Sequence, residues 1–147
     1  MKPLHIFAFL AFAPLSFMPQ AGVAADLVVV PASETTLDSL LWQSRPVVVF
    51  ADSPDDLQFQ RQMQLLAEDA AALEDRDVLV ITDTDPTARS SVRQRLRPRG
   101  FSLVLVDKDG EVKMRQPRPL RVREITHAID RWPLRRQEML ERRPSGR

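Results

Sequence analysis

Carboxylate side chains follow two apolar runs of this sequence. Asp52, Asp55 and Asp56 come just after the first run, and Asp83 and Asp85 come just after the second. If the two runs are neighbouring parallel strands, these side chains lie at one end of a sheet, where α/β proteins often bind ligands. Carboxylate oxygens coordinate Mg²⁺ and Ca²⁺, and paired carboxyl groups can act as general acid and base. Asp52, Asp55 and Asp83 therefore form a candidate metal or acid–base cluster.

Helix capping gives the first group of carboxylates a structural role instead. Ser53 can cap a helix, and Pro54 suits the first helical position. Asp55 and Asp56 then complement the positive end of the helix dipole. The same residues that could bind a metal are therefore typical of a helix start.

The second group has the same alternative. Asp85 can cap a helix that has Pro86 at its first position, and Asp83 suits a turn. Arg97 and Arg99 are expected to reach the same end of the sheet and to neutralise the carboxylates. The sequence also contains no DxDxDG calcium loop. We prefer capping and ion pairing to metal binding, and we predict no metal site, no catalytic residues and no cofactor.

Thiol chemistry is excluded because the chain contains no cysteine. This absence rules out disulfide exchange, thiol peroxidases and cysteine-ligated metals. A Ser-His-Asp triad would need His127, the only histidine after residue 25, and its expected place in the last helix is far from Ser53. We therefore interpret His127 as a surface residue.

The N-terminus is typical of an export signal. A short basic start is followed by an apolar stretch at residues 6–18 and by the small residues Gly22 to Ala25. We expect residues 1–25 to be a signal peptide that is cleaved after Ala25, with export to the periplasm or the extracellular medium. The alternative is an uncleaved anchor, but the stretch contains Pro14 and is shorter than the ~20 residues that span a bilayer. No later segment could span one.

After removal of those residues, 122 of the 147 remain, which suffices for one domain with its own core. We divide them into a domain at residues 26–133 and a basic tail at residues 134–147. The tail is rich in arginine, and we predict a short helix after Pro133 that forms a solvated end. Contact with an anionic surface is the alternative for the tail. Nucleic acid is not an expected partner of an exported protein.

Three apolar runs predict the centre of one sheet. Val47–Phe50, Val78–Ile81 and Leu103–Val106 are continuous rather than alternating, as in strands that are covered on both faces. Asp107–Gly110 predicts a hairpin turn, because its Asp-Gly pair suits the positive φ of such turns. Val112–Met114 alternates, as an edge strand does.

Amphipathic helices are predicted between and after these strands. Their apolar residues recur every three or four positions, which places them on one helix face. The first set is Phe59, Met63, Leu66, Ala70 and Leu73; the second is Ala88, Val92 and Leu96; the last is Val122, Ile125, Ile129 and Trp132. Before the first run, Leu27 to Val30 could add a strand, and Leu37, Leu40 and Leu41 could line a short helix.

The predicted core order is β-α-β-α-β-β-α, which indicates an α/β three-layer sandwich. Two parallel units followed by a hairpin and a closing helix resemble the thioredoxin fold. In that fold the active site follows the first core strand, where the helix dipole and backbone amides stabilise a thiolate. Residues 51–56 carry carboxylates at this place, and residues 100–102 occupy the position of the cis-proline that the fold requires. Both departures predict that the protein is redox-inactive.

A further pattern extends over most of the chain. It consists of five segments in order: Arg45–Ala51, Ser53–Asp56, Arg93–Phe101, Asp107–Gly110 and Pro133–Met139. Together they resemble the domain of unknown function DUF4174, from about Thr36 to Leu140. This resemblance implies a thioredoxin-like or peroxiredoxin-like fold in small exported bacterial proteins, with similar domains in animal extracellular-matrix and sushi-repeat proteins. It implies no reaction, because the family offers no catalytic residues to carry over.

These observations favour a non-catalytic binding or scaffold module of the cell envelope, whose partner is another protein. Two alternatives stay open. The first is a divalent-metal-binding protein or enzyme that uses Asp52, Asp55 and Asp83. The second is association with the envelope surface through the arginine-rich tail.

Overall fold

The computed structural model describes residues 25–143. Of the predicted signal peptide at residues 1–25, only Ala25 lies within the described residues. The residues before the predicted cleavage site, Gly22 to Ala24, lie outside them. Within residues 25–143, no helix has both the length and the apolar character needed to cross a membrane.

A five-stranded mixed sheet forms the middle layer, in the order β1-β3-β2-β4-β5. Its strands are β1 (Val29–Pro31), β2 (Arg45–Phe50), β3 (Val78–Asp83), β4 (Ser102–Val106) and β5 (Val112–Gln116). β3 runs parallel to both β1 and β2, whereas β4 is antiparallel to both β2 and β5. The three predicted central strands are confirmed, and the segment at 27–30 contributes most of edge strand β1.

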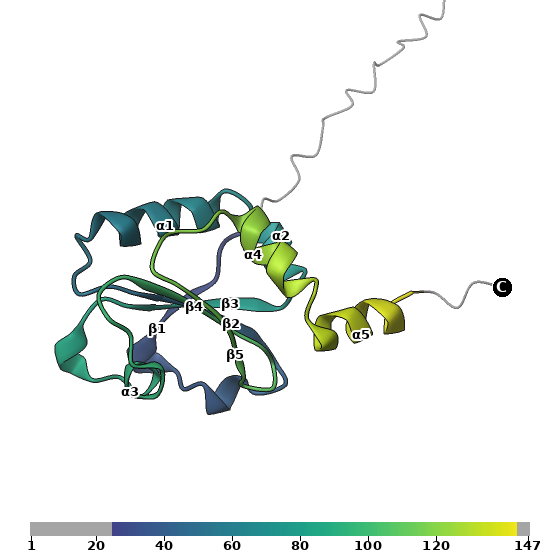
Figure 1. Ribbon diagram of the computed structural model, residues 1–147, viewed down its shortest axis with the longest axis horizontal. Helices are drawn as coiled ribbons and strands as arrows, with labels where there is room; N and C mark the ends of the chain where they lie inside the picture. The colour runs from purple at the N-terminus through teal and green to yellow at the C-terminus, as the bar shows by residue number, and fades with distance from the viewer. Residues whose placement is uncertain (1–24, 144–147) are drawn as a thin grey trace, which may run out of the picture.

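Helices cover both faces of this sheet (Figure 1). On one face lie α1 (Leu57–Ala67), α2 (Ala70–Glu74) and α4 (Val122–Ile129), and on the other lies α3 (Ser91–Leu96). Three short 3-10 helices, η1 (Ala32–Glu34), η2 (Asp38–Leu40) and η3 (Pro86–Ala88), lie in the connections, and α5 (Pro133–Glu141) follows α4. The predicted three layers and the core order β-α-β-α-β-β-α are therefore confirmed.

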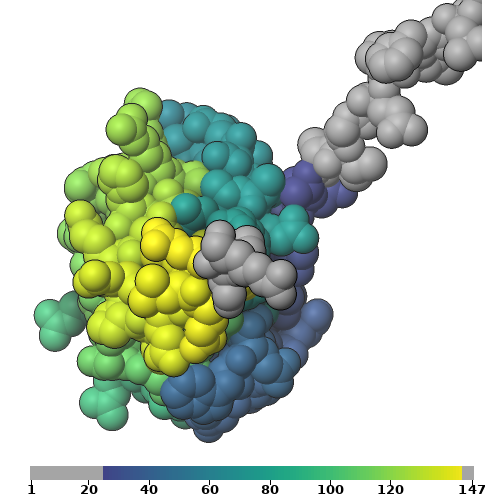
Figure 2. Space-filling model, turned by 90° about the vertical axis from the view of Figure 1, so that its right-hand side faces the viewer, coloured from purple at the N-terminus to yellow at the C-terminus, as the bar shows by residue number. Residues whose placement is uncertain are grey.

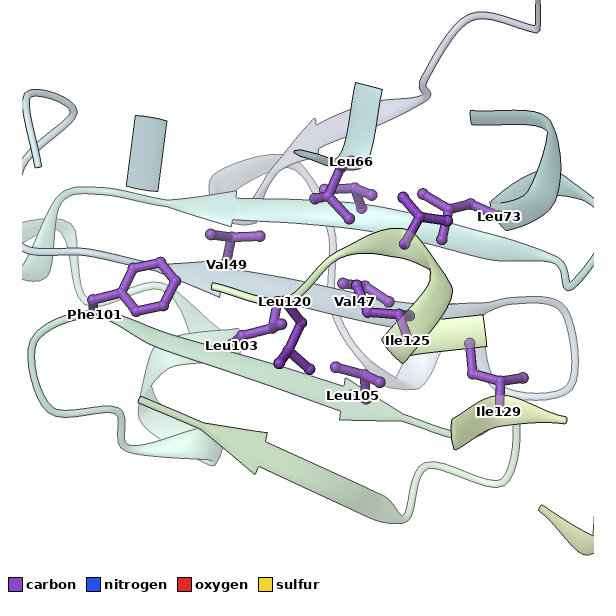
Figure 3. Close-up of a cluster of buried hydrophobic side chains, with 12 residues drawn as sticks. Val47, Val49, Leu66, Leu73, Phe101, Leu103, Leu105, Leu120, Ile125 and Ile129 are labelled. Atoms are coloured by element: carbon purple, nitrogen blue, oxygen red, sulfur yellow. The ribbon is translucent and has the colours of Figure 1, made fainter. Parts of the chain in front are cut away.

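Alternate residues of the central strands enter two separate cores. Val47, Val49, Leu103 and Leu105 pack with residues from α1, α2 and α4, among them Leu66, Leu73, Ile125 and Ile129 (Figure 3). Val48, Phe50, Ile81 and Val104 pack on the other face with Val92 and Leu96 of α3. Successive side chains of a strand point to opposite faces of the sheet. A strand with a core on each face therefore has a continuous run of apolar residues in its sequence.

The predicted helix over residues 59–73 is divided into α1 and α2. Asp69 has a non-helical backbone, with φ −148° and ψ +65°, and its Oδ1 accepts a hydrogen bond of 3.1 Å from the amide of Ala72. An aspartate that caps a new helix in this way competes with continuation of the previous one. Ala70 and Leu73 are nevertheless buried, so the apolar face was predicted correctly.

The hairpin between β4 and β5 forms as predicted. Gly110 has a φ of +83°, and its amide donates to the carbonyl of Asp107 at 2.9 Å. The turn returns the chain as edge strand β5, where Val112 is exposed.

Candidate functional site

The segment after β2 forms the start of α1, as predicted, but a different residue caps the helix. Asp56 Oδ1 accepts from the amide of Phe59 at 3.0 Å, and the helix begins at Leu57. Ser53 Oγ accepts only from the amide of Asp55, at 3.2 Å, within the preceding turn. The prediction of Ser53 as cap and Pro54 as first helical residue was therefore wrong by three residues, because Asp56 also offers a capping oxygen.

Asp56→Ala is expected to lower the free energy of unfolding by about 1 kcal/mol, because it leaves a helix amide without its acceptor. Ser53→Ala is the matched control and should cost less than about half of that, since its hydrogen bond lies in an exposed turn. Urea denaturation of the two variants measures the difference. Equal losses would contradict the assignment of Asp56 as the cap.

Asp83 is buried at the end of β3 and is held by Arg93 and Ser90. Its oxygens accept from Ser90 Oγ at 2.6 Å and from Arg93 Nε and Nη2 at 3.1 and 2.9 Å. Burial alone would raise the pKa of Asp83, but the hydrogen bonds from Arg93 and Ser90 and the charge of Arg93 outweigh it and lower the pKa. Asp83 is therefore an ionised and fully engaged carboxylate, which does not suit a general acid.

Arg93 joins the ends of β2 and β3. Its Nη2 also donates to the backbone carbonyls of Ala51 and Asp83, at 3.0 and 3.1 Å, and its guanidinium lies 5.3 Å from the ring centroid of Phe50. Charge-assisted hydrogen bonds of this kind are stronger than neutral ones. One side chain thus fixes the backbone immediately before residues 52–56.

The other predicted cluster residues do not join Asp83. Asp52 and Asp55 are exposed, as is Asp85, whose carboxylate caps η3 through Thr87. Hydrogen bonds from the side chain and amide of Thr87 lower the pKa of Asp85. Within residues 25–143, no group of three histidine, aspartate or glutamate side chains is arranged so that it could hold a metal ion.

The predicted counter-charges were also wrong for Asp83. Its ion-pair partner is Arg93, at 2.9 Å, rather than Arg97 or Arg99. Ser90 caps α3, and Arg93 lies one turn further along the same helix, so both side chains reach back to the end of β3. The signal in the sequence was a capping serine seven residues after the aspartate that ends the strand, followed three residues later by arginine.

A second group of charged residues lies at the opposite end of β2, where sequence analysis predicted none. Arg45, the first residue of β2, is fully buried and donates from Nε to Asp107 Oδ1 at 2.8 Å. Its Nη1 and Nη2 donate to the two carboxylate oxygens of Glu138 at 3.1 and 2.9 Å. Lys108 Nζ lies 3.0 Å from Glu138 and 2.7 Å from Asp77. Strand β2, the hairpin and α5 therefore meet in one ion-pair network.

Helix α5 is attached to the domain by this network and by Arg135. Arg135 is 4% exposed and donates to the carboxylate of Asp75 at 2.9 Å. Arg76 binds Asp130 with two hydrogen bonds, of 2.9 and 2.8 Å, beside the start of α5. Figure 2 shows α5, in yellow, packed against the body of the molecule. The predicted helix after Pro133 is confirmed, but it is not a solvated end.

Glu138 makes this attachment dependent on pH. Burial would raise the pKa of Glu138, but hydrogen bonds from Arg45 and Lys108 and their charges lower it from 4.5 to about 2. Because the pKa is lower in the folded chain than in the unfolded chain, the stabilisation is present above about pH 5 and is lost as the pH falls towards 2.

The contribution of Glu138 to the free energy of unfolding should therefore fall by roughly 3 kcal/mol between about pH 5 and pH 2. Glu138→Gln should be less stable than the wild type at pH 7, and the two stability curves should converge at low pH. Urea denaturation across this range measures the difference. Parallel curves would contradict an ionised, paired Glu138.

His127 lies on the exposed side of α4, as predicted. The described residues thus contain two polar arrangements: a helix start after β2 that is held by Arg93 and Asp83, and a buried ion-pair network that attaches α5.

Comparison with solved structures identifies the fold. The reduced 2-Cys peroxiredoxin of Plasmodium vivax has a TM-score of 0.54 at 14% identity, over 71% of this chain and 85% of that one. Chloroplastic thioredoxin z has a TM-score of 0.53 at 17% identity, over 71% and 92%. A thioredoxin from Thermus thermophilus has a TM-score of 0.50 at 21% identity, over 80% and 90%. At these identities the similarity shows the fold alone, which is thioredoxin-like.

Comparison with curated proteins finds no match. A protein-family model, "Domain of unknown function (DUF4174)", matches residues 36–138. The matched region includes the segment after β2, Arg93, and both Arg135 and Glu138 of α5. On this evidence the chain belongs to the DUF4174 family.

Proposed function

We propose that this protein is a redox-inactive binding or scaffold module of the cell envelope, and that its partner is another protein. The observation that carries the proposal is the structure of the segment after β2. A thioredoxin-like active site would place a thiolate there, at the start of the following helix. This chain has no cysteine and instead places Asp56 at the cap of α1.

The surroundings of this segment support the same proposal. Arg93 donates hydrogen bonds to the carbonyl of Ala51 and to the carboxylate of Asp83. A group that already has its hydrogen-bond partners is a poor proton donor or acceptor for a substrate. The residues here therefore favour a stable surface over a reactive one.

The alternatives from the sequence lack comparable support. Asp52, Asp55 and Asp83 do not form a metal-binding group within the described part of the chain. In the tail, Arg135 is buried against Asp75, and Arg142 lies 3.6 Å from Asp77. Two of the five arginines at residues 134–147 thus pair with carboxylates of the domain.

Export is part of the proposal and has its own test. Residues 1–25 have the pattern of a signal peptide. Fractionation of the source cells should recover a protein that begins at Asp26, outside the cytoplasm, and deletion of residues 2–25 should leave it inside. Full-length protein in the cytoplasm would contradict export.

Affinity capture tests the binding role. The tagged protein, isolated from an extract of its own cell envelope, should retain one protein partner in a stoichiometric amount. A tagged, unrelated exported protein of similar size is the control. Recovery of no partner above this control, at low and moderate salt, would contradict a protein-binding module.

A further inference from the structure

A cavity of about 400 Å³ lies between the end of α3 and strand β5. Three arginines line it, Arg97, Arg99 and Arg115, together with the apolar side chains of Leu96, Phe101 and Pro117. Ser102, which also lines the cavity, pairs with Phe50 across the sheet. The cavity therefore adjoins the end of β2, next to the segment that begins α1.

The positive charge of this cavity is not neutralised by the protein. No aspartate or glutamate lines it, and none of its three arginines forms a salt bridge within residues 25–143. The buried and half-buried arginines elsewhere, such as Arg45 and Arg93, do pair with carboxylates. Arg97, Arg99 and Arg115 are themselves exposed, so their charge is accessible to a ligand from solvent.

The side chain of Arg115 is fixed at the cavity by a neutral partner. Its Nη2 donates to the carbonyl of Leu96 at 2.7 Å, which positions the guanidinium without cancelling its charge. A guanidinium has five donors, so this bond leaves others for a ligand.

The backbone of the loop is also unusual at Arg97. This residue ends α3 in the left-handed region, with φ +48° and ψ +59°. Glycine is the usual residue in such a position, because a β-carbon there costs about 1 kcal/mol. The chain instead carries a long cationic side chain that reaches the cavity.

We propose that this cavity binds a phosphate monoester. The guanidinium groups would hold the tetrahedral oxyanion, for which their planar donor geometry is well suited. The organic group of the ester would contact Leu96, Phe101 and Pro117. This inference goes beyond the proposed function, because it gives the domain a small-molecule ligand in addition to a protein partner.

Titration of the purified protein with three probes at low salt tests the site. Phenyl phosphate should bind more tightly than inorganic phosphate, because it adds apolar contact, and phenol should not bind detectably. Vesicles that contain phosphatidic acid distinguish a lipid headgroup from a soluble ester. If the protein co-sediments with these vesicles and phenyl phosphate prevents it, the lipid headgroup is a ligand of the same site. Failure of phenyl phosphate to bind at millimolar concentrations would overturn the proposal.

Variants separate binding from folding. Arg97→Gly removes a guanidinium and also removes the β-carbon that is unfavourable at this left-handed position, so the free energy of unfolding should stay the same or rise. The same variant should weaken phenyl phosphate binding by about tenfold or more. Arg99→Gln should weaken binding similarly. Arg61→Gln and Arg123→Gln alter exposed arginines on other helices and are the matched controls.

Equal binding by Arg97→Gly and the wild type, or an equal loss in the controls, would overturn the proposed site. These results are independent of the capture experiment. A captured protein partner with no phosphate binding would contradict only the phosphate site. Phosphate binding with no captured partner would contradict only the protein-binding role.

Discussion

Replacement of Arg45 with methionine is expected to lower the free energy of unfolding by about 3–5 kcal/mol, the cost of breaking a buried ion pair. Arg45 is fully buried, and Asp107 is 1% exposed. The variant removes the hydrogen bonds to Asp107 and Glu138 and leaves the carboxylate of Asp107 buried without its counter-charge. Urea denaturation at pH 7 measures the loss.

Arg61→Met is the matched control for this variant. Arg61 is exposed on α1, so the control should change the free energy of unfolding by less than about 0.5 kcal/mol. Arg45→Met should also increase proteolytic cleavage around α5, because Glu138 loses two hydrogen bonds. A loss below about 1 kcal/mol for Arg45→Met would contradict a network that attaches the helix.

Replacement of Arg93 with methionine should lower the free energy of unfolding by about 3 kcal/mol. The side chains of Arg93 and Asp83 are 12% and 5% exposed, so the remaining carboxylate would be largely screened from water. The variant also removes the donor to the carbonyl of Ala51. Because this backbone leads into residues 52–56, hydrogen exchange of the first amides of α1 should become faster.

Arg95→Met is the control on the same helix. Arg95 pairs with Asp38 at 2.6 Å, but the two side chains are 50% and 74% exposed. Exposed pairs contribute about 0–1 kcal/mol, so this variant should lose much less stability than Arg93→Met. A double-mutant cycle with Asp83→Asn should further show that the effects of Arg93 and Asp83 are not additive. Similar losses for Arg93→Met and Arg95→Met would contradict the special role of Arg93.

The fold could be predicted because its signals are local. The continuous runs in β2, β3 and β4 follow from a core on each face of the sheet. The spacing of Val122, Ile125 and Ile129 likewise predicts the buried face of α4. Such patterns need only the residues of one element.

The polar contacts were less predictable because they join distant parts of the chain. Arg45 and Glu138 are 93 positions apart, and no spacing rule connects them. At the candidate site, Ser53, Asp55 and Asp56 could each cap a helix, and only the backbone path selects Asp56. For Asp83, the choice of Arg93 over Arg97 and Arg99 depends on the face of α3 that meets β3, which the order of elements alone does not give.

Reduction of insulin disulfides and consumption of peroxide are the two activities that a redox-inactive thioredoxin-like module must lack. The purified protein should give the rate of the buffer in both assays, and an active thioredoxin should give a clear rate in the first. Turnover by the wild-type chain in either assay would contradict a redox-inactive module.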